Sequence, residues 1–331
     1  MKRLVFWTIA ASLLLGLAAC NKGSEEASNN PATPSTTGSA PSGEKPLVLF
    51  AQANSQDPWR QVFDADTKAA AEKYSTEMAF EEQDAEDDPT KQISVIETFL
   101  VKKPKVLLVS PVTEAVQSAT DKAFDAGIPV ILLDRSVPGD KYTAYVGGDN
   151  KEIGKAAGEF MAKKLNGKGI VLMIQGIAGA PPTKDRAAGF MEAIAKYPGI
   201  TILAGDDCGY QRAKAQSYME TFLQKKQPFD AVYAHNDEMA IGAFMAMQAG
   251  NVPKKVIVGI DGCQKEVVDM IKEGKLDATF TYPQPGPKAI ELAADILKGK
   301  LPTEKKILLP TEMVTKENAD AFLSAHPNLA K

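Results

Sequence analysis

The sequence predicts an α/β protein of two doubly wound parallel-sheet domains with Rossmann-like topology. Short, continuous apolar runs, such as 106–109 and 129–133, alternate with longer amphipathic segments. Such runs are typical of strands buried on both faces, and their alternation with helices indicates βαβ units. The alternation passes through two cycles, and a chain of 331 residues is long enough for two cores.

The first cycle covers residues 47–146. Apolar runs predict strands at 47–51, 77–80, 106–109, 129–133 and 142–146. Helical spacing of apolar residues predicts helices at 62–74, 89–102 and 113–126. In the second of these helices Ile93, Ile96, Phe99 and Leu100 share one face, and Gly127 ends the third.

The second cycle begins near residues 149–153, where we expect the chain to cross first between the domains. The same patterns predict helices at 153–165, 184–196, 211–225, 238–249, 267–273 and 288–298. They predict strands at 169–174, 201–204, 231–234, 256–260 and 278–282.

The first 20 residues have the pattern of a secretory signal peptide. Lys2 and Arg3 precede an almost wholly apolar stretch, and small residues lead to Cys20. This end resembles a bacterial lipobox, which implies that Cys20 is lipidated and becomes the mature N-terminus in the periplasm or cell envelope. An ordinary signal peptide with a chance cysteine and a short membrane anchor are the alternatives. Residues 21–45 are polar and aperiodic, and we interpret them as a disordered tether.

Composition narrows the classes of partner and cofactor. The net charge is −4 without a basic block, which argues against nucleic acid. No apolar run after the first 20 residues is long enough to span a bilayer, so we expect membrane contact through the lipid only. The two histidines, His235 and His326, form no metal-binding pattern with cysteine, and we expect neither a metal nor a cofactor. Cys208 and Cys263 follow predicted strands of one sheet, and either a disulfide or two free thiols fits.

Polar side chains follow nearly every predicted strand. Ligands of open α/β sheets bind outside the carboxyl ends of the strands, so these positions are candidates for a binding site. They include Asn54, Asp57, Trp59 and Arg60, then Ser110, then Asp134 and Arg135, and in the second cycle Arg186, Tyr210, His235, Asn236 and Asp261.

These residue types suit a small polyhydroxylated ligand. Carboxylates and guanidinium groups form charge-assisted hydrogen bonds with vicinal hydroxyls, and the apolar face of a ring can lie on Trp59 or Tyr210. Each residue also has a structural interpretation. Asp134 and Arg135 could form a local ion pair, Asn236 could cap a helix, and Asp261 could belong to a turn.

Several stretches together resemble the periplasmic sugar-binding proteins of the ribose and galactose type, the receptors of ABC importers. The resemblance covers about 47–310. It is carried by DPWR (57–60), IPVILLDRS (128–136), GDN (148–150), IQGIAGAPPTKDRAAGF (174–190), VYAHNDEMAIGA (232–243) and VGIDG (258–262). Trp59-Arg60, LLDRS and AHNDEMAIGA look most like the galactofuranose-binding branch.

The resemblance implies a type I periplasmic binding protein whose ligand sits in a cleft between two domains joined by three crossovers. The N-terminal domain would then comprise 46–149 and 283–310, and the C-terminal domain 150–282 and 311–331. By matching motif, Asp57, Trp59 and Arg60 would lie in the first loop and Asp134 and Arg135 would bond ring hydroxyls. Arg186, Asn236 and Asp261 would do so from the other side, with Tyr210 stacking on the sugar and Tyr282 at the last crossover.

Three positions depart from the ribose pattern. Arg60 stands where ribose-type proteins carry a second aromatic residue, and Ser110 and Tyr282 stand where they carry amides. These changes argue against plain ribose. They favour a more polar ligand, such as a furanose hexose, a ring with an exocyclic polyol, or an acidic sugar.

Four functions compete for this site. The first is a tethered, monomeric receptor that closes on a monosaccharide and presents it to an ABC permease. The second is a secreted glycosidase or sugar isomerase, but no nucleophile elbow, metal cluster or phosphate loop accompanies the carboxylates, so we expect no enzyme. The third, a sugar-responsive repressor, would need a DNA-binding module where the signal and tether stand. The fourth is a subunit that reports sugar occupancy to a membrane sensor; a receptor for a non-sugar polyol or nucleoside is a further alternative.

Overall fold

The computed structural model describes residues 44–327 and residue 329, and it contains two six-stranded sheets. Both sheets lie in one compact unit that begins at Glu44. The signal, lipidation and tether predictions for 1–43 fall outside the described residues. Within those residues, no helix combines the length and the apolar character needed to cross a bilayer.

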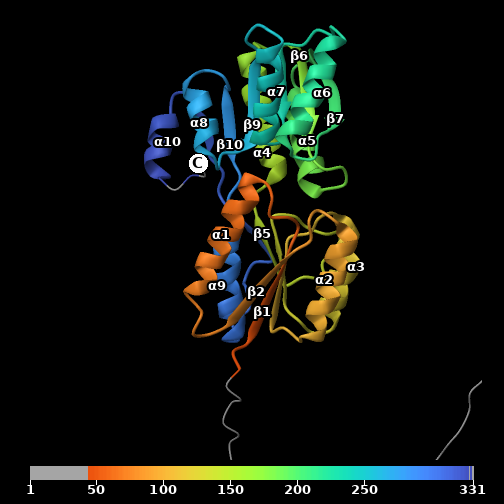
Figure 1. The fold of residues 1–331 in the computed structure, drawn as a ribbon, viewed down its shortest axis with the longest axis vertical. Coiled ribbons are helices and arrows are strands. Elements are labelled where there is room, and N and C mark those ends of the chain that lie inside the picture. Colours follow the sequence, from red (N-terminus) through yellow and green to blue (C-terminus); the bar gives the residue numbers. More distant parts are fainter. Residues whose placement is uncertain (1–43, 328, 330–331) are drawn as a thin grey trace, which may run out of the picture. The chain divides into compact units, whose positions relative to one another are not determined.

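The first sheet forms the N-terminal lobe and has the strand order β11-β5-β4-β3-β1-β2, with every pairing parallel. Its strands are β1 (Leu47–Gln52), β2 (Ala79–Asp84), β3 (Val106–Val109), β4 (Val130–Leu133), β5 (Ala144–Gly147) and β11 (Lys306–Leu308). Its helices are α1 (Pro58–Glu72), α2 (Pro89–Val101), α3 (Gln117–Asp125) and α9 (Gly286–Leu297). Helices α1 and α9 cover one face, and α2 and α3 cover the other (Figure 1).

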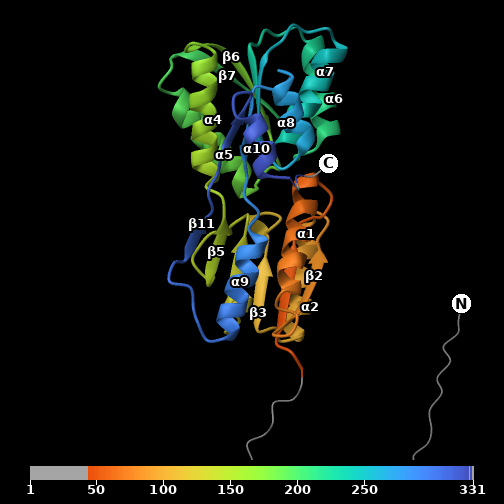
Figure 2. The same cartoon turned by 90° about the vertical axis from the view of Figure 1, so that its left-hand side faces the viewer.

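The second sheet forms the C-terminal lobe, with the order β12-β10-β9-β8-β6-β7; only β12 is antiparallel to its neighbour. Its strands are β6 (Lys168–Gln175), β7 (Gly199–Asp207), β8 (Ala231–Ala234), β9 (Val256–Asp261), β10 (Ala278–Thr281) and β12 (Met313–Thr315). Its helices are α4 (Asn150–Lys164), α5 (Pro181–Ile194), α6 (Arg212–Gln224), α7 (Asp237–Ala249), α8 (Lys265–Lys272) and α10 (Ala319–Ala325). Helices α4 and α5 pack together on one side, and α6 and α7 on the other (Figure 2).

The chain crosses between the lobes three times: from β5 to α4, from β10 to α9, and from β11 to β12. This confirms the predicted fold class of two doubly wound sheets joined by three crossovers. The continuous apolar runs have the expected cause, since successive residues of a strand enter opposite layers. Leu107 packs with the layer that contains Phe99 of α2, whereas Leu108 packs with the layer that contains Phe63 of α1.

Several predicted boundaries differ from the observed ones. Strand β2 runs from Ala79 to Asp84 instead of 77–80, and β7 runs from Gly199 to Asp207 instead of 201–204, because their polar residues pair with neighbouring strands outside any apolar run. Helix starts differ where a cap or a proline begins the helix. Helix α1 begins at Pro58 rather than at Val62, because Asp57 caps it by accepting a hydrogen bond from the amide of Arg60. Helix α5 likewise begins at Pro181 rather than at Lys184. The segment predicted as one helix at 113–126 is a 3₁₀ turn (Glu114–Val116) followed by α3. Strands β11 and β12 have only three residues each and were not predicted.

Helices α4 and α5 approach each other at backbone distance. A Cβ atom at Gly154 would collide with the carbonyl of Arg186, and one at Gly189 would collide with the carbonyl of Lys151. This close packing brings Arg186 of α5 next to Asn150, the first residue of α4. The side chain of Arg186, in the C-terminal lobe, thus contacts Asn150 at the first crossover.

Candidate functional site

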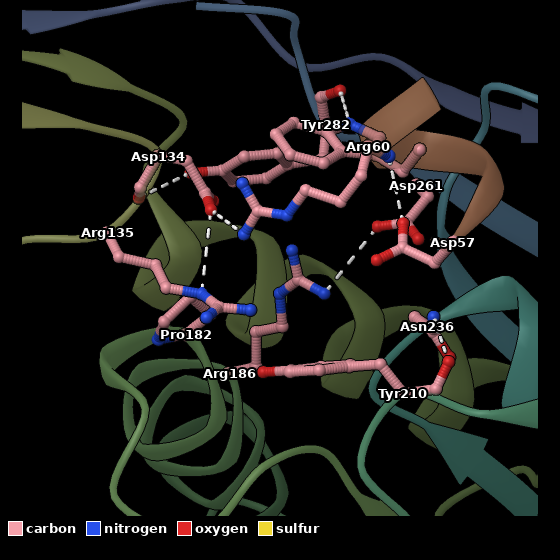
Figure 3. A pocket seen from close by; sticks show the side chains of 11 residues that line it. Asp57, Arg60, Asp134, Arg135, Pro182, Arg186, Tyr210, Asn236, Asp261 and Tyr282 are labelled. Carbon is pink, nitrogen blue, oxygen red and sulfur yellow. Dashed lines mark hydrogen bonds and ion pairs between the residues drawn. The ribbon is translucent and has the colours of Figure 1, made fainter. Parts of the chain in front are cut away.

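A cavity lies between the carboxyl ends of the two sheets, and both lobes line it (Figure 3). Its lining residues are Asp57, Trp59, Arg60, Asp134, Arg135, Pro182, Arg186, Tyr210, Asn236, Asp261 and Tyr282. Ten of the eleven residues proposed from the sequence are therefore brought together; Ser110 is absent from the lining, and Pro182 was not proposed. The cavity measures about 30 Å³, room for about two water molecules. A larger ligand needs the side chains or the lobes to separate.

Ends of secondary-structure elements supply almost all of these side chains. Asp57, Trp59 and Arg60 stand at the start of α1, and Asp134 and Arg135 directly follow β4. From the C-terminal lobe come five further positions: Arg186 on α5, Tyr210 after β7, Asn236 as the cap of α7, Asp261 at the end of β9 and Tyr282 after β10. The strand-end rule places these residues because parallel strands end at the same edge of a sheet.

An arginine–aspartate pair dominates the N-terminal wall. Nη2 of Arg60 lies 2.5 Å from Oδ2 of Asp134, and both side chains are buried. Nη1 of Arg60 donates to the hydroxyl of Ser110 at 2.9 Å. Ser110 is fully buried behind the cavity, so it supports Arg60 rather than lining the site. The sequence pattern placed Ser110 correctly at a strand end but did not show that Arg60 covers it.

Arg135 is the second guanidinium of this wall. Its Nε lies 3.6 Å from Oδ2 of Asp134, and Nη1 donates to the carbonyl of Val112 at 2.9 Å. Burial lowers the pKa of Arg135, and the positive charge of Arg60 lowers it further. The buried Nε makes no hydrogen bond within the described residues. Because an unsatisfied buried donor is costly, this N–H is available to a ligand acceptor.

The C-terminal wall is organised around Arg186. Its Nη1 lies 3.7 Å from Oδ1 of Asp261, and its Nε donates to the side-chain oxygen of Asn150 at 2.8 Å. Nη1 also donates to the carbonyl of His235. Asn236 caps α7 through Met239 and donates its amide to the carbonyl of Tyr210 at 3.2 Å. The structural role predicted for Asn236 therefore exists beside its position in the cavity.

Aromatic side chains hold the guanidinium groups on their faces. The Cζ of Arg60 lies 4.9 Å from the ring centre of Trp59, and that of Arg186 lies 5.0 Å from the ring of Tyr282. The indole N–H of Trp59 donates to the carbonyl of Tyr282 at 3.0 Å. Trp59 and Arg60 belong to the first turn of α1 rather than to a loop, because Asp57 caps the helix before them. Tyr282 stands at the second crossover, from β10 to α9, and not at the last one as expected, because the chain crosses again from β11 to β12. Sugar stacking on Trp59 or Tyr210 stays a prediction.

Three lining residues have a backbone conformation that is unusual for side chains other than glycine. The φ angles are +61° at Asp134, +61° at Tyr210 and +131° at Asp261. Such conformations cost about 1–3 kcal/mol each and concentrate at functional sites. Contacts around Asp134, Tyr210 and Asp261 stabilise these conformations, and all three side chains line the same cavity.

Two acidic groups of the lining, Asp57 and Asp261, are harder to ionise than ordinary carboxylates. Burial raises the pKa of Asp261 well above its usual range, with Arg186 opposing and Asp237 adding to the shift. Burial also raises the pKa of Asp57. Asp237 lies behind the cavity, where burial raises its pKa to about 7. Its Oδ2 accepts hydrogen bonds from the amide of Gly262 at 2.7 Å and from Thr279 at 2.9 Å.

Sequence reasoning did not single out several residues that support the site. Asn150 and Asp237 stand inside the motifs GDN and AHNDEMAIGA, so a signal for them was present. Tyr145 lies inside β5, and its hydroxyl donates to the carbonyl of Asp134 at 2.9 Å. Gln52 is the last residue of β1 and contacts Arg60. It is polar and directly follows the strand predicted at 47–51, so its position was a signal, whereas nothing in an apolar strand pattern marks Tyr145.

The cysteines and the candidate metal ligands of the chain lie as follows. Cys208 and Cys263 are both buried and unpaired, so the structure has two free thiols rather than the disulfide left open above. Among residues 44–327, no group of three or more His, Cys, Asp or Glu side chains is arranged to hold a metal ion.

Known proteins resemble this chain over most of its length. The ribose import binding protein of Haemophilus influenzae is 35% identical over 252 residues, which cover 73% of this chain and 85% of that protein. The galactofuranose-binding protein of Escherichia coli is 32% identical over 298 residues, which cover 86% and 92%. The solved fructose-binding periplasmic domain of a hybrid two-component system superposes with a TM-score of 0.81 at 34% identity, covering 85% of this chain and 94% of that domain.

The family description of the periplasmic binding protein domain matches residues 48–301, which contain both walls of the cavity. The relatives are solute-binding proteins rather than enzymes. Fold, extent of identity and the matched range agree, and the chain belongs to the periplasmic binding protein family.

Proposed function

We propose that this protein is a solute receptor of a sugar ABC importer that captures one neutral monosaccharide in its furanose form. The observation that carries the proposal is the cavity lining: three arginines and three aspartates, supplied by both lobes, converge with Tyr210 and Asn236 on one small space. Such groups match the donor and acceptor pattern of vicinal hydroxyls. The galactofuranose-binding relative supports the furanose assignment, as does the replacement of ribose-type residues at Arg60, Ser110 and Tyr282.

The charges of the lining favour a neutral ligand over an acidic sugar. Arg60 and Arg135 both lie within 4 Å of Asp134, and Arg186 pairs with Asp261. Asp57 supplies a third carboxyl against the three guanidinium groups. A carboxylate on the ligand would add a further acidic group to a buried site in which each guanidinium already faces a carboxyl, and its desolvation would need a free cation. We therefore favour a neutral hexose over an acidic sugar as the ligand.

Every lining residue except Pro182 has a proposed role, and Ser110 behind the lining has one as well. Asp57, Arg60, Asp134 and Arg135 would bond hydroxyls from the N-terminal lobe, and Arg186, Asn236 and Asp261 from the C-terminal lobe. Trp59, Tyr210 and Tyr282 would cover the faces of the ring, and Ser110 would hold Arg60. A ligand that bonds both walls binds the closed arrangement better than the open one, and this difference in affinity drives hinge closure. No step of this function requires catalysis or a cofactor.

Delivery of the sugar is the finer part of the proposal. A signal and lipid at Cys20, with 21–45 as a tether, would hold a monomeric receptor at the cell envelope within reach of the permease. The likeness to a sensor's periplasmic domain supports a second role, in which closure reports sugar to a membrane receptor. Uptake of labelled sugar by cells with and without this gene separates the two roles: loss of uptake supports import, and unchanged uptake supports sensing.

The test of ligand class is a calorimetric titration of the chain from Lys45 onward. The probes are D-galactose, D-ribose, L-arabinose, D-fructose, myo-inositol and D-galacturonic acid. We expect one neutral sugar to bind with a micromolar or lower dissociation constant, about −8 kcal/mol or better. The ring form in the complex is then determined from the ¹³C shift of C1 of the labelled sugar. Preferred binding of the uronic acid, or of the cyclitol, would overturn the neutral furanose assignment.

A further inference from the structure

A buried glutamine lies directly behind Arg60, outside the cavity lining. Gln52, the last residue of β1, is fully buried. Its Oε1 accepts from the amide of Ala53 at 2.9 Å and from Nη1 of Arg60 at 3.3 Å. Its Nε2 donates to Oδ1 of Asp64 at 2.5 Å. The candidate site makes no direct use of either Gln52 or Asp64.

The chemistry of these partners fixes which way the amide points. The amide of Ala53 and the guanidinium of Arg60 are donors only, and an ionised Asp64 is an acceptor only. One orientation of Gln52 satisfies all three, with Oε1 toward Arg60 and Nε2 toward Asp64. The reverse orientation would set donor against donor twice in a buried position, which is costly. Gln52 therefore presents a fixed acceptor to Arg60.

The position of Asp64 explains why a glutamine is needed between the two charges. Arg60 and Asp64 are four residues apart and both buried on α1. Their charged groups lie more than 4.0 Å apart and form no direct ion pair. Gln52 from the neighbouring strand bonds each of them, so the negative charge of Asp64 reaches Arg60 through a neutral amide. Arg60 keeps its direct ion pair for Asp134, at the cavity.

A second acidic group lies near Asp64. Burial raises the pKa of Glu82 of β2 to about 7, and the negative charge of Asp64 adds to the shift. Lys68, one turn further along α1, lies 3.3 Å from Oε2 of Glu82. The hydrogen bond that anchors Asp64 comes from Gln52.

We propose that Gln52, anchored by Asp64, is a positioning residue for ligand binding: it orients the guanidinium of Arg60 toward Asp134 and the ligand. This inference rests on the proposed function, because Arg60 is there a ligand-binding residue. Ser110 shares the task, since it accepts from the same Nη1 at 2.9 Å. The two acceptors hold one end of the guanidinium, and the other end faces Asp134.

The first experiment measures sugar affinity by calorimetry in a double-mutant cycle of Gln52→Met and Arg60→Lys. Methionine retains the length of the side chain and removes the acceptor. We expect Gln52→Met to weaken binding about tenfold in the wild-type background, which is the usual scale for a hydrogen bond to a charged group. In the Arg60→Lys background the same change should alter affinity by less than about twofold, because its target is already gone. An equal effect in both backgrounds, or none in either, would overturn the proposal.

A matched pair at position 64 separates positioning from general destabilisation. Asp64→Asn keeps an oxygen for Gln52, so we expect affinity within about twofold of wild type. Asp64→Leu has similar size but no acceptor, and we expect weaker binding by about three- to tenfold. Melting temperatures are measured in parallel. Loss of stability with unchanged affinity in Asp64→Leu and Gln52→Met would assign both residues a merely structural role.

A readout without sugar distinguishes failure of this inference from failure of the proposed function. In protein labelled with ¹⁵N-arginine, the resonances of Arg60 are assigned by their loss in Arg60→Lys. Hindered rotation about Cζ–Nη should give resolved Nη signals in the wild type and averaged signals in Gln52→Met. Resolved signals in both proteins would refute the positioning role even if no sugar bound. If the expected NMR difference is observed but no sugar binds, only the proposed function is refuted.

Discussion

At the residue scale, the site is a set of buried charges that depend on each other. Arg60 and Asp134 are the closest pair, and each offsets part of the cost of burying the other, with Arg135 3.6 Å from the same carboxylate oxygen. Because these groups are already buried and held by their partners, a sugar hydroxyl meets oriented donors and acceptors.

Breaking the Arg60–Asp134 pair on one side should harm both stability and binding. We expect Arg60→Met to lower the free energy of unfolding by about 3 kcal/mol, because it leaves Asp134 buried with only the more distant guanidinium of Arg135 beside it. Arg60→Met combined with Asp134→Asn should recover most of that stability but no sugar affinity. Denaturant unfolding and calorimetry on the same samples check both expectations. Equal stability of the single and double variants would contradict the buried-pair account.

Asp237 should make stability depend on pH. Its pKa rises from an ordinary 3.8 to about 7 in the folded state, chiefly through burial. A carboxyl with a raised pKa binds its proton more tightly when folded, so its contribution to stability is complete below about pH 4 and is lost as pH rises through 7. We expect Asp237→Asn to flatten the fall in unfolding free energy between pH 4 and 7 by a few kcal/mol. Glu304→Gln, at an exposed position, is the control and should leave the slope unchanged.

At the element scale, the crossovers contain side chains of the site as well as the hinge. The hydroxyl of Tyr282, after β10, donates to the carbonyl of Asp134 at 2.9 Å and accepts from Asn150 at 3.4 Å. Asn150 in turn accepts from Arg186. A hydrogen-bonded chain therefore runs from a cavity residue of one lobe to a cavity residue of the other through two crossovers. Hinge geometry and ligand-binding geometry are coupled in this arrangement.

Removing the hydroxyl of Tyr282 should loosen the closed arrangement. Tyr145 still donates to the carbonyl of Asp134, so we expect Tyr282→Phe to fold normally. Sugar affinity should fall by about three- to tenfold, mainly through faster dissociation, since a contact between the lobes is lost. Stopped-flow binding measures the two rates. Tyr218→Phe on α6, away from the crossovers, should leave both rates unchanged, and a slower association with unchanged dissociation in Tyr282→Phe would contradict the expectation.

At the scale of the whole molecule, closure brings side chains at the rim of the cleft together. Nζ of Lys184 on α5 lies 2.9 Å from Oε2 of Glu114 in the N-terminal lobe, and both are more than a third exposed. An exposed pair of this kind contributes at most about 1 kcal/mol. The buried contacts at the cavity therefore decide closure, and the rim pair adjusts it.

Reversing one charge of this rim pair should have a small, salt-sensitive effect. We expect Lys184→Glu to weaken sugar affinity less than fivefold at low salt, because it replaces attraction with repulsion between the lobes. The difference from wild type should disappear at about 1 M salt, where screening extends over only about 3 Å. Titrations at two salt concentrations check this. A large effect that persists in high salt would show that the position acts by another route.

Local patterns in the sequence were enough to predict the fold class and most of the residues that line the site. Continuous apolar runs between amphipathic segments identify parallel strands, and parallel strands end at one edge, so the residues after them had to gather. This reasoning brought Asp134, Arg186 and Asp261 together although they are far apart in the chain. It works because strand direction and burial are properties of short segments.

How these residues pair, and which residues support them, became visible only in the folded structure. Ser110 lies behind Arg60, Gln52 acts from the end of β1 and Tyr145 from inside β5. The three-residue strands β11 and β12 form only against partners from distant segments. Positive φ angles at Asp134, Tyr210 and Asp261 aim those side chains. Each of these features depends on contacts between segments far apart in sequence, and such contacts have no local pattern, because their free energy arises only when the lobes fold and close.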